Sequence, residues 1–288
     1  MRVLENLIKK NIDVKIIWVG YQEDVSKIPS YSNNIIKLPV ADGGDNTLDT
    51  LVEVTKGKIY ETTATGPDGK KIKTKWGALG DNKTAVIEMA KISGLTLVDR
   101  NKLKPYTYTT YGMGEVIKEC LNYGFNNFII GIGGSATNDG GLGMAEALGA
   151  ILKDKNNKPI KRGIIGLGSL NTIDLKNIDK RIRNSSFQIA CDVNNPLYGP
   201  NGATYIFGPQ KGFNSEEIEL IDSYMKNYGN LIDSISKKEI SKHPGSGAAG
   251  GIGAAAMYFL NAKLKSGSGI VLDYLEFTKH CQNIDIEI

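Results

Sequence analysis

The sequence predicts an α/β protein, and three stretches carry this prediction. Residues 128–150 begin with a short apolar run rich in β-branched residues, pass into glycines and small polar residues, and continue with apolar residues at spacings of three. This order is typical of a strand, a glycine-rich loop and a helix. Residues 57–79 alternate around the turn sequence at 66–69 and predict a β-hairpin. Residues 187–193 form another apolar run and predict a second buried strand.

The composition is that of a globular protein. With 288 residues, of which 41% are hydrophobic, the chain is long enough for one large or two ordinary domains. The net charge of +4 is small, and no basic run contains interleaved aromatic residues, which argues against a nucleic-acid partner. The 3 cysteines lack CxxC spacing and there are only 2 histidines, which argues against a disulfide framework and a zinc site.

The N-terminal part of the chain carries little chemistry. Residues 14–19 predict a strand, VKIIWV. No run of about 18 apolar residues predicts a membrane span, and no signal-peptide pattern is present. The expected compartment is therefore the cytoplasm, and no membrane partner is expected.

The polar-glycine stretch 41–47 is the first that suggests a site. Asp42, Gly43, Gly44 and Asp45 precede Asn46 and a segment with helical apolar spacing. Two carboxylates that flank a glycine pair are typical of a loop that binds magnesium or a hydroxyl group. The alternative is that Asp45 or Asn46 only caps the helix. Both interpretations stay open.

Two predicted elements precede the central loop. Residues 84–89 predict a strand that ends at Glu88, which we interpret as a solvated or capping carboxylate. Residues 111–122 predict a helix whose apolar face includes Cys120, so this thiol is expected to be an inert core group. Gly124 follows as the stop signal of the helix.

The glycine-rich loop at 133–141 is the strongest indication of ligand binding. A strand, an open backbone and a helix start form the arrangement in which free N–H groups receive an anion, most often a phosphate. A tight turn also needs glycine, so a purely structural role stays open, and the loop matches neither GxGxxG nor the Walker pattern. The residues that could contact a ligand are Gly133, Gly134, Ser135, Asn138 and Asp139.

Two charged residues follow the second buried strand. Asp192 emerges at its carboxyl end, where α/β folds place ligands, although an aspartate here could also cap a turn. Lys211 lies within 208–212, a sequence that favours a turn, and a single lysine in a turn is usually solvated.

The last third of the chain contains a predicted helix and another glycine-rich stretch. Asn214 or Ser215 is expected to cap the helix, whose apolar residues continue to Ile232. Residues 243–253 are dense in glycine and alanine, which indicates either very close packing or a second helix start that faces a phosphate. His243, which precedes a proline, is expected to be structural.

Four stretches together resemble the type I bacterial glycerate kinases, in this order and at these separations. The resemblance extends from about residue 35 to about residue 285. The family's PDSFKGS-like N-terminal loop and its ITGEGRxDxQT-like C-terminal segment have no counterpart here, so we expect an altered N-terminus and a missing C-terminal segment. The stretches are ADGGDNTLD at 41–49, IGIGGSATNDGGLGMAEALG at 130–149, ACDVNNPLYGPNGATYIFGPQKG at 190–212 and PGSGAAGGIGAA at 244–255.

This resemblance implies a fold of two lobes with an active-site cleft between them. One is a Rossmann-like lobe with a parallel sheet, incomplete in this chain, and the other is a mixed α/β lobe. The expected Rossmann-like lobe comprises residues 1–56, 105–185 and 262–288, and the mixed lobe comprises 57–104 and 186–261.

The resemblance also implies ATP-dependent phosphorylation of a hydroxyl of D-glycerate, giving 2- or 3-phosphoglycerate, with ATP and Mg²⁺ as cofactors. A homo-oligomer is compatible with it. Phosphoryl transfer requires mainly positioning and charge neutralisation. The implied roles are catalysis for Asp192 and Lys211, phosphate or glycerate binding for Gly133, Gly134, Ser135, Asn138, Asp42, Gly43 and Gly44, and magnesium binding for Asp45 and Asp139.

Two other functions are weighed against the kinase. The first is a truncated, inactive remnant that at most binds glycerate or nucleotide. The second is a dinucleotide-dependent dehydrogenase, which rests only on the order strand, glycine loop, helix and lacks the GxGxxG spacing. A glycerate-dependent ATPase assay distinguishes the kinase from the remnant.

Overall fold

A computed structural model of the chain describes residues 16–21, 35–40, 46–276 and 286–287. Its largest sheet has six strands in the order β10-β9-β6-β5-β4-β3. The strands are β3 (Lys58–Thr65), β4 (Lys71–Ala78), β5 (Thr84–Glu88), β6 (Asn127–Gly131), β9 (Ser186–Ala190) and β10 (Lys263–Lys265).

The sheet is parallel on one side and antiparallel on the other. Strands β5, β6, β9 and β10 run parallel to one another, whereas β3 and β4 form the predicted antiparallel hairpin and β4 pairs antiparallel with β5. The predicted α/β class and the strands expected at 84–89, 128–132 and 187–193 are confirmed, although the last ends at Ala190.

Both faces of the sheet are covered, which explains why its central strands are apolar throughout. One core contains Ala85, Ile87, Phe128 and Ile130, together with residues of the helices on that face. A second core lies on the opposite face, where alternate strand residues pack against helices α3 (Thr47–Val54) and α11 (Gly267–Tyr274). Successive side chains along a strand point to opposite faces of the sheet, so neighbouring residues of one strand belong to different cores.

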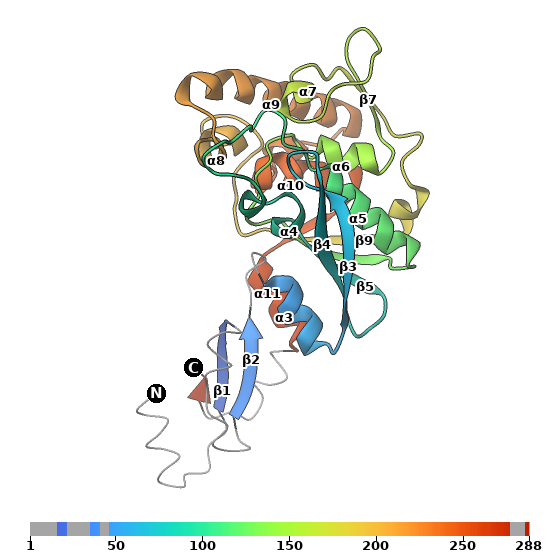
Figure 1. Ribbon diagram of the computed structural model, residues 1–288, viewed down its shortest axis with the longest axis vertical. Helices are drawn as coiled ribbons and strands as arrows, with labels where there is room; N and C mark the ends of the chain where they lie inside the picture. The colour runs from blue at the N-terminus through green and yellow to red at the C-terminus, as the bar shows by residue number, and fades with distance from the viewer. Residues whose placement is uncertain (1–15, 22–34, 41–45, 277–285, 288) are drawn as a thin grey trace.

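Two smaller sheets complete the strands. Strands β1 (Ile16–Tyr21), β2 (Ile35–Val40) and β11 (Ile286–Glu287) form a parallel sheet with β1 in the centre. Figure 1 shows it at the lower end of the molecule, with α3 and α11 between it and the large sheet. Strands β7 (Ile151–Lys153) and β8 (Thr172–Asp174) form an antiparallel pair.

The helices expected from apolar spacing form where the sequence predicts them. Helix α5 (Tyr111–Asn122) has the predicted bounds. Its Cys120 is buried, and this burial raises the pKa of the thiol well above its ordinary value. The predicted cap of α9 is Asn214, which forms a capping box with Glu217. The remaining helical elements are α4 (Ala90–Ser93), η1 (Leu95–Leu97), α5 (Tyr111–Asn122), α6 (Leu142–Ala147), α7 (Ile164–Leu167), η2 (Lys180–Asn184), α8 (Ala203–Lys211), α9 (Ser215–Ser236), η3 (Ile240–Lys242) and α10 (Ala248–Phe259).

The start of α3 corrects the expected cap by Asn46 and confirms the capping alternative for Glu88. Asn46 occupies the N-cap position, but its side chain makes no capping hydrogen bond. The N–H group of Leu48 instead donates to Glu88 Oε1 at 2.7 Å, and Glu88 Oε2 lies 2.8 Å from Lys91 Nζ. Glu88 is only 1% exposed, so it is a buried capping carboxylate and not a solvated one. Burial raises its pKa, and the contacts with Lys91 and Leu48 oppose this shift.

The large sheet extends across the two expected lobes. Strand β6, expected in the Rossmann-like lobe, lies between β5 and β9, which were expected in the mixed lobe. Because one sheet contains strands from both expected lobes, it does not mark where one lobe ends and the other begins, and the lobe boundaries stay a prediction. Within the described ranges, none of the helices has the length and apolar character needed to cross a membrane.

Candidate active site

The candidate site lies at the edge of the large sheet where the parallel strands end. Strands β5, β6, β9 and β10 have the same direction, so the segments that follow them emerge on the same side. The glycine-rich loop follows β6 and Asp192 follows β9 by two residues. The topology therefore brings two of the predicted ligand-binding segments to one edge.

A cavity of about 380 Å³ lies at this edge. The glycine loop contributes Gly133, Gly134 and Ser135 to its lining, and the segment after β9 contributes Asp192. Helices α8 and α10 contribute further residues, so three of the four stretches that carry the family resemblance meet here. The other lining residues are Leu95, Ile132, Ala190, Cys191, Val193, Phe207, Gln210, Ala248 and Ala249.

The glycine loop is fixed from one side and open on the other. Leu95 N–H donates to the Gly134 carbonyl, and Ala136 N–H donates to the Ser93 carbonyl, each at 2.9 Å. These bonds attach the loop to the segment formed by α4 and η1. Among the described residues, none accepts a hydrogen bond from the N–H groups of Gly133, Gly134 or Ser135. The cavity therefore has backbone donors available for an anionic ligand.

Asp192 has a capping role and a place in the cavity at the same time. Its Oδ1 and Oδ2 accept from the N–H group of Gly267, the first residue of α11, at 3.1 and 3.3 Å. The side chain is nevertheless exposed and lines the cavity. The N–H group orients the carboxylate and leaves lone pairs for a second donor, because a carboxylate accepts about four hydrogen bonds.

Lys211 differs from the expectation of a solvated turn residue. It is the last residue of α8, it is 1% exposed, and its Nζ donates to the Thr137 carbonyl at 2.7 Å. It lies on the face of α8 that carries Thr204 and Gly208, at helical spacings of seven and three, and this face is buried. Burial lowers the pKa of the Lys211 ammonium to about 7, and the nearby Asp139 carboxylate opposes this shift.

Asn138 and Asp139 are buried residues of the same loop and do not line the cavity. Asn138 is 1% exposed and donates from Nδ2 to Thr204 Oγ1 at 3.1 Å. The Asp139 carboxylate accepts from the N–H and hydroxyl of Thr110 and from the N–H groups of Gly141 and Gly143. Burial raises the pKa of this carboxyl, and these hydrogen bonds oppose the shift.

The expected magnesium ligands do not form a site in the described residues. The oxygens of Asp139 are already engaged by four donors, and its side chain is 1% exposed. Asp45, with Asp42, Gly43 and Gly44, lies outside the described residues. The described part of the chain contains no group of three or more His, Cys, Asp or Glu side chains placed to hold a metal ion.

The glycine-rich stretch before α10 is built for close packing. Ala249, Gly250 and Gly251 all have positive φ, so regular helix geometry begins only after them. A Cβ at Gly250 would lie 2.1 Å from the Thr137 carbonyl oxygen. This backbone therefore lies directly against the glycine loop, as the close-packing interpretation of 243–253 expects. Ala248 and Ala249 also line the cavity, so the alternative, a helix start that faces a phosphate, stays a prediction.

The burial of Lys211 predicts a specific dependence of stability on pH. Between about pH 7 and pH 10.5 the amine is protonated in the unfolded chain and neutral in the folded one, so the unfolding free energy should rise with pH. One such group contributes at most about 1.4 kcal/mol per pH unit. From pH 7 to pH 9, the unfolding free energy of the native protein should rise by about 2 kcal/mol more than that of Lys211→Met.

Urea denaturation at both pH values measures this difference. Lys155→Met, at an exposed turn position, removes the same charge and serves as the control, because it should retain the pH dependence of the native protein. If native protein and Lys211→Met gain or lose stability equally between the two pH values, the amine is not titrating in the core.

Nine lining residues of the cavity were not predicted as site residues, and three of them come from helical segments outside the glycine-rich stretches. Phe207 and Gln210 are three residues apart on α8 and share the face directed to the cavity, and Leu95 comes from η1. If the sequence had predicted a helix over 203–211, the spacing of Phe207 and Gln210 would have placed them on one face. The Gly208-Pro209 dipeptide within this range is typical of a turn, so no helix was predicted.

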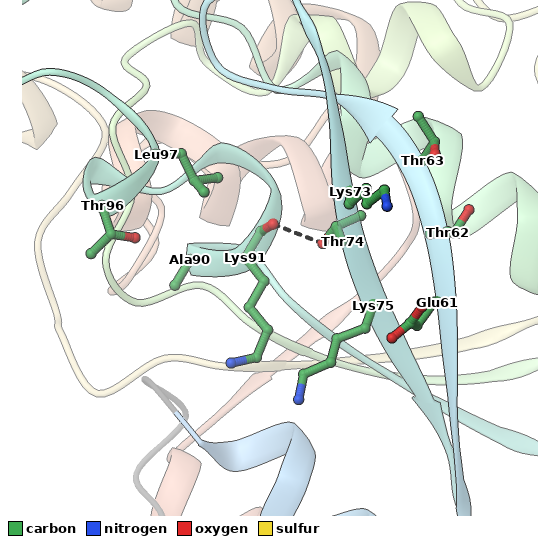
Figure 2. A pocket seen from close by; sticks show the side chains of 10 residues that line it. All are labelled: Glu61, Thr62, Thr63, Lys73, Thr74, Lys75, Ala90, Lys91, Thr96 and Leu97. Carbon is green, nitrogen blue, oxygen red and sulfur yellow. Dashed lines mark hydrogen bonds between the residues drawn. The ribbon is translucent and has the colours of Figure 1, made fainter.

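A larger cavity, of about 650 Å³, lies beside the hairpin, and none of the predicted site residues that the structure describes lines it (Figure 2). Its walls are the β3–β4 hairpin and the segment from α4 to η1, and Lys73, Lys75 and Lys91 line it. Lys75 Nζ lies 2.6 Å from Asp49 Oδ1, and Lys91 Nζ lies 2.8 Å from Glu88 Oε2. Carboxylates already pair two of its cations, so the smaller cavity is the stronger candidate for an anionic substrate.

Comparison with known proteins identifies the family. The sequence profile of the glycerate kinase family matches residues 19–288. Glycerate 2-kinase of Escherichia coli K12 is 46% identical over 253 residues, which cover 88% of this chain and 66% of that protein. Glycerate kinase of Bacillus subtilis 168 is 44% identical, with coverage of 88% and 66%. The chain thus spans about two thirds of the length of these curated relatives.

A solved structure agrees with this result. The crystal structure of a protein from Salmonella typhimurium LT2, assigned as glycerate kinase 2, superposes with a TM-score of 0.88 at 39% identity, and the match covers 96% of this chain and 78% of that one. By profile, sequence identity and fold, this chain belongs to the glycerate kinase family.

Proposed function

We propose that this protein is a kinase that transfers a phosphoryl group from ATP to a hydroxyl of D-glycerate. The observation that carries the proposal is the cavity at the sheet edge, where the glycine loop, Asp192 and the start of α10 meet in a chain of the glycerate kinase family. The product is 2- or 3-phosphoglycerate. The name of the Escherichia coli relative, glycerate 2-kinase, favours the 2-hydroxyl.

The cavity has the parts that positioning of a small hydroxy acid requires. The N–H groups of Gly133, Gly134 and Ser135 have no acceptor within the described ranges, so they can donate to the carboxylate of glycerate or to a phosphate. Asp192 is the exposed carboxylate of the lining, so we assign it the proton of the attacking hydroxyl. Gln210 contributes an amide that can hydrogen-bond a substrate hydroxyl or carboxylate.

The proposed reaction transfers the γ-phosphoryl group directly from ATP to glycerate. The hydroxyl oxygen of glycerate forms a bond to the γ-phosphorus of ATP, and the bond from this phosphorus to the β–γ bridging oxygen breaks, with its electron pair remaining on ADP. The hydroxyl proton moves to the Asp192 carboxylate.

The buried polar residues have a different role in this proposal. Lys211 donates to the Thr137 carbonyl, and Asn138 donates to the Thr204 hydroxyl. The Asp139 carboxylate accepts from N–H groups at the start of α6. We therefore assign Lys211, Asn138 and Asp139 to positioning of the loop that donates to the ligand. We expect magnesium to bind together with ATP, coordinated by its phosphates.

A coupled assay of ADP release tests the proposal. With Mg-ATP present, ADP release should depend on D-glycerate and saturate with it, and L-glycerate should be a poor substitute. If ligands bind but no ADP forms above background, the protein is the inactive binding form considered above. Release of ADP at the same rate with and without glycerate would contradict the kinase assignment.

A further inference from the structure

A second cavity, of about 370 Å³, adjoins the candidate site. Cys191, Asp192 and Val193 line both this cavity and the first one. The segment that follows β9 therefore has a cavity on each of two sides, and the Asp192 carboxylate belongs to both. The remaining lining residues of the second cavity are Asn194, His243, Pro244, Leu264, Lys265 and Ser266.

The two cavities differ in charge. Lys265 and His243 line the second cavity, whereas the described residues that line the first include no lysine, arginine or histidine. The first cavity instead offers backbone N–H groups and the Gln210 amide, which suit a three-carbon hydroxy acid with one negative charge. A chain of phosphates carries several negative charges and is held in proteins by lysine and other cationic groups.

We infer that the second cavity receives the phosphate chain of the nucleoside triphosphate donor, while D-glycerate occupies the first. This inference rests on the proposed function. Phosphoryl transfer requires the attacking hydroxyl and the γ-phosphorus to meet in line, and two cavities that share Asp192 provide such a meeting point. The bonds made and broken are those of the reaction given above.

The cation of this cavity is available for such a role. Lys265 Nζ lies 3.7 Å from Asp273 Oδ2, but the side chains are 44% and 71% exposed, and such exposed ion pairs contribute little. His243 Nδ1 is 2.7 Å from the Pro244 carbonyl, which can only accept, so this nitrogen carries a proton. In the neutral ring Nε2 then only accepts, so His243 gives a phosphate no donor, and Lys265 is the residue with the larger expected effect.

The test compares Lys265→Met with Lys263→Met. Both lysines are exposed residues of β10, two positions apart, but only Lys265 lines the cavity. Isothermal titration with the non-hydrolysable analogue AMP-PNP and magnesium measures donor binding without turnover. Steady-state kinetics then give the KM for ATP and the KM for D-glycerate separately, and Gln210→Ala provides the converse variant.

For Lys265→Met we expect a rise of about tenfold or more in the Kd of AMP-PNP and in the KM for ATP. The KM for D-glycerate should change by less than about twofold. Lys263→Met should match the native protein, and Gln210→Ala should raise the KM for D-glycerate alone. The inference is overturned if Lys265→Met binds AMP-PNP as tightly as Lys263→Met does, or if the native protein does not bind the analogue at millimolar concentration.

Failure of the proposed function has a separate signature. If AMP-PNP binds and Lys265→Met weakens this binding, but no phosphoglycerate forms, the donor cavity is supported and the kinase activity is contradicted. If phosphoglycerate forms and Lys265→Met raises only the KM for D-glycerate, the kinase stands and the assignment of the two cavities is wrong.

Discussion

Replacement of Asp192 by asparagine is expected to lower kcat for glycerate phosphorylation by about 10²- to 10⁴-fold, the usual contribution of a general base. Asparagine is nearly isosteric and retains an oxygen that can accept from the N–H group of Gly267, so α11 should stay capped. It cannot take the hydroxyl proton. Because positioning of substrate is preserved, the KM for D-glycerate should change little, and the loss should appear in kcat.

Asp222→Asn is a suitable control for this variant. Like Asp192, Asp222 accepts one backbone N–H with both oxygens, here that of Gly199 at 3.0 and 2.9 Å, but it does not line either cavity at the sheet edge. Its kcat should stay within about threefold of the native value, because only a hydrogen bond to the bend at Gly199, outside both cavities, is altered. A loss below about threefold in Asp192→Asn would exclude Asp192 as the base.

Replacement of Gly250 by alanine is expected to destabilise the protein by about 2–4 kcal/mol. The added Cβ would lie 2.1 Å from the Thr137 carbonyl oxygen, and backbone at both positions would have to move. The positive φ of 68° adds a strain that alanine does not relieve. The clash is with the same carbonyl that Lys211 holds, so the glycine loop should be displaced as well.

Gly124→Ala separates the two causes. Gly124 also has a positive φ, of 91°, but a Cβ there meets nothing within 4 Å, so only the backbone strain of about 1 kcal/mol is expected. Urea denaturation of the two variants and the native protein gives the free energies of unfolding. Equal losses in Gly124→Ala and Gly250→Ala would mean that the close approach of α10 to the loop has no energetic consequence.

Local sequence patterns predicted the elements that local interactions determine. Helix 111–122, the Asn214 cap and the hairpin around 66–69 each depend on neighbours within a few residues, and the structure has them as expected. The residue that caps α3, in contrast, is far from the helix in the sequence. Glu88 is 40 residues from Leu48, and its role required knowledge of how β5 lies against α3.

The residues of the cavity were partly predictable for a related reason. Gly133, Gly134 and Asp192 follow apolar strands, and the carboxyl ends of parallel strands collect at one edge, so their meeting follows from the fold class. The burial of Lys211 does not follow, because it depends on which face of α8 packs against the loop. Two residues that differ by one position, Gln210 and Lys211, thus have opposite environments.

The most direct test of the kinase assignment is a ³¹P NMR record of the reaction with Mg-ATP and D-glycerate. We expect one new phosphomonoester resonance that grows in step with the loss of ATP and coincides with added 2-phosphoglycerate, and no growth with Asp192→Asn on the same timescale. A resonance that coincides with 3-phosphoglycerate would change only the hydroxyl assigned. Inorganic phosphate as the product of ATP loss, or an unchanged ATP spectrum, would contradict the assignment of this chain as a glycerate kinase.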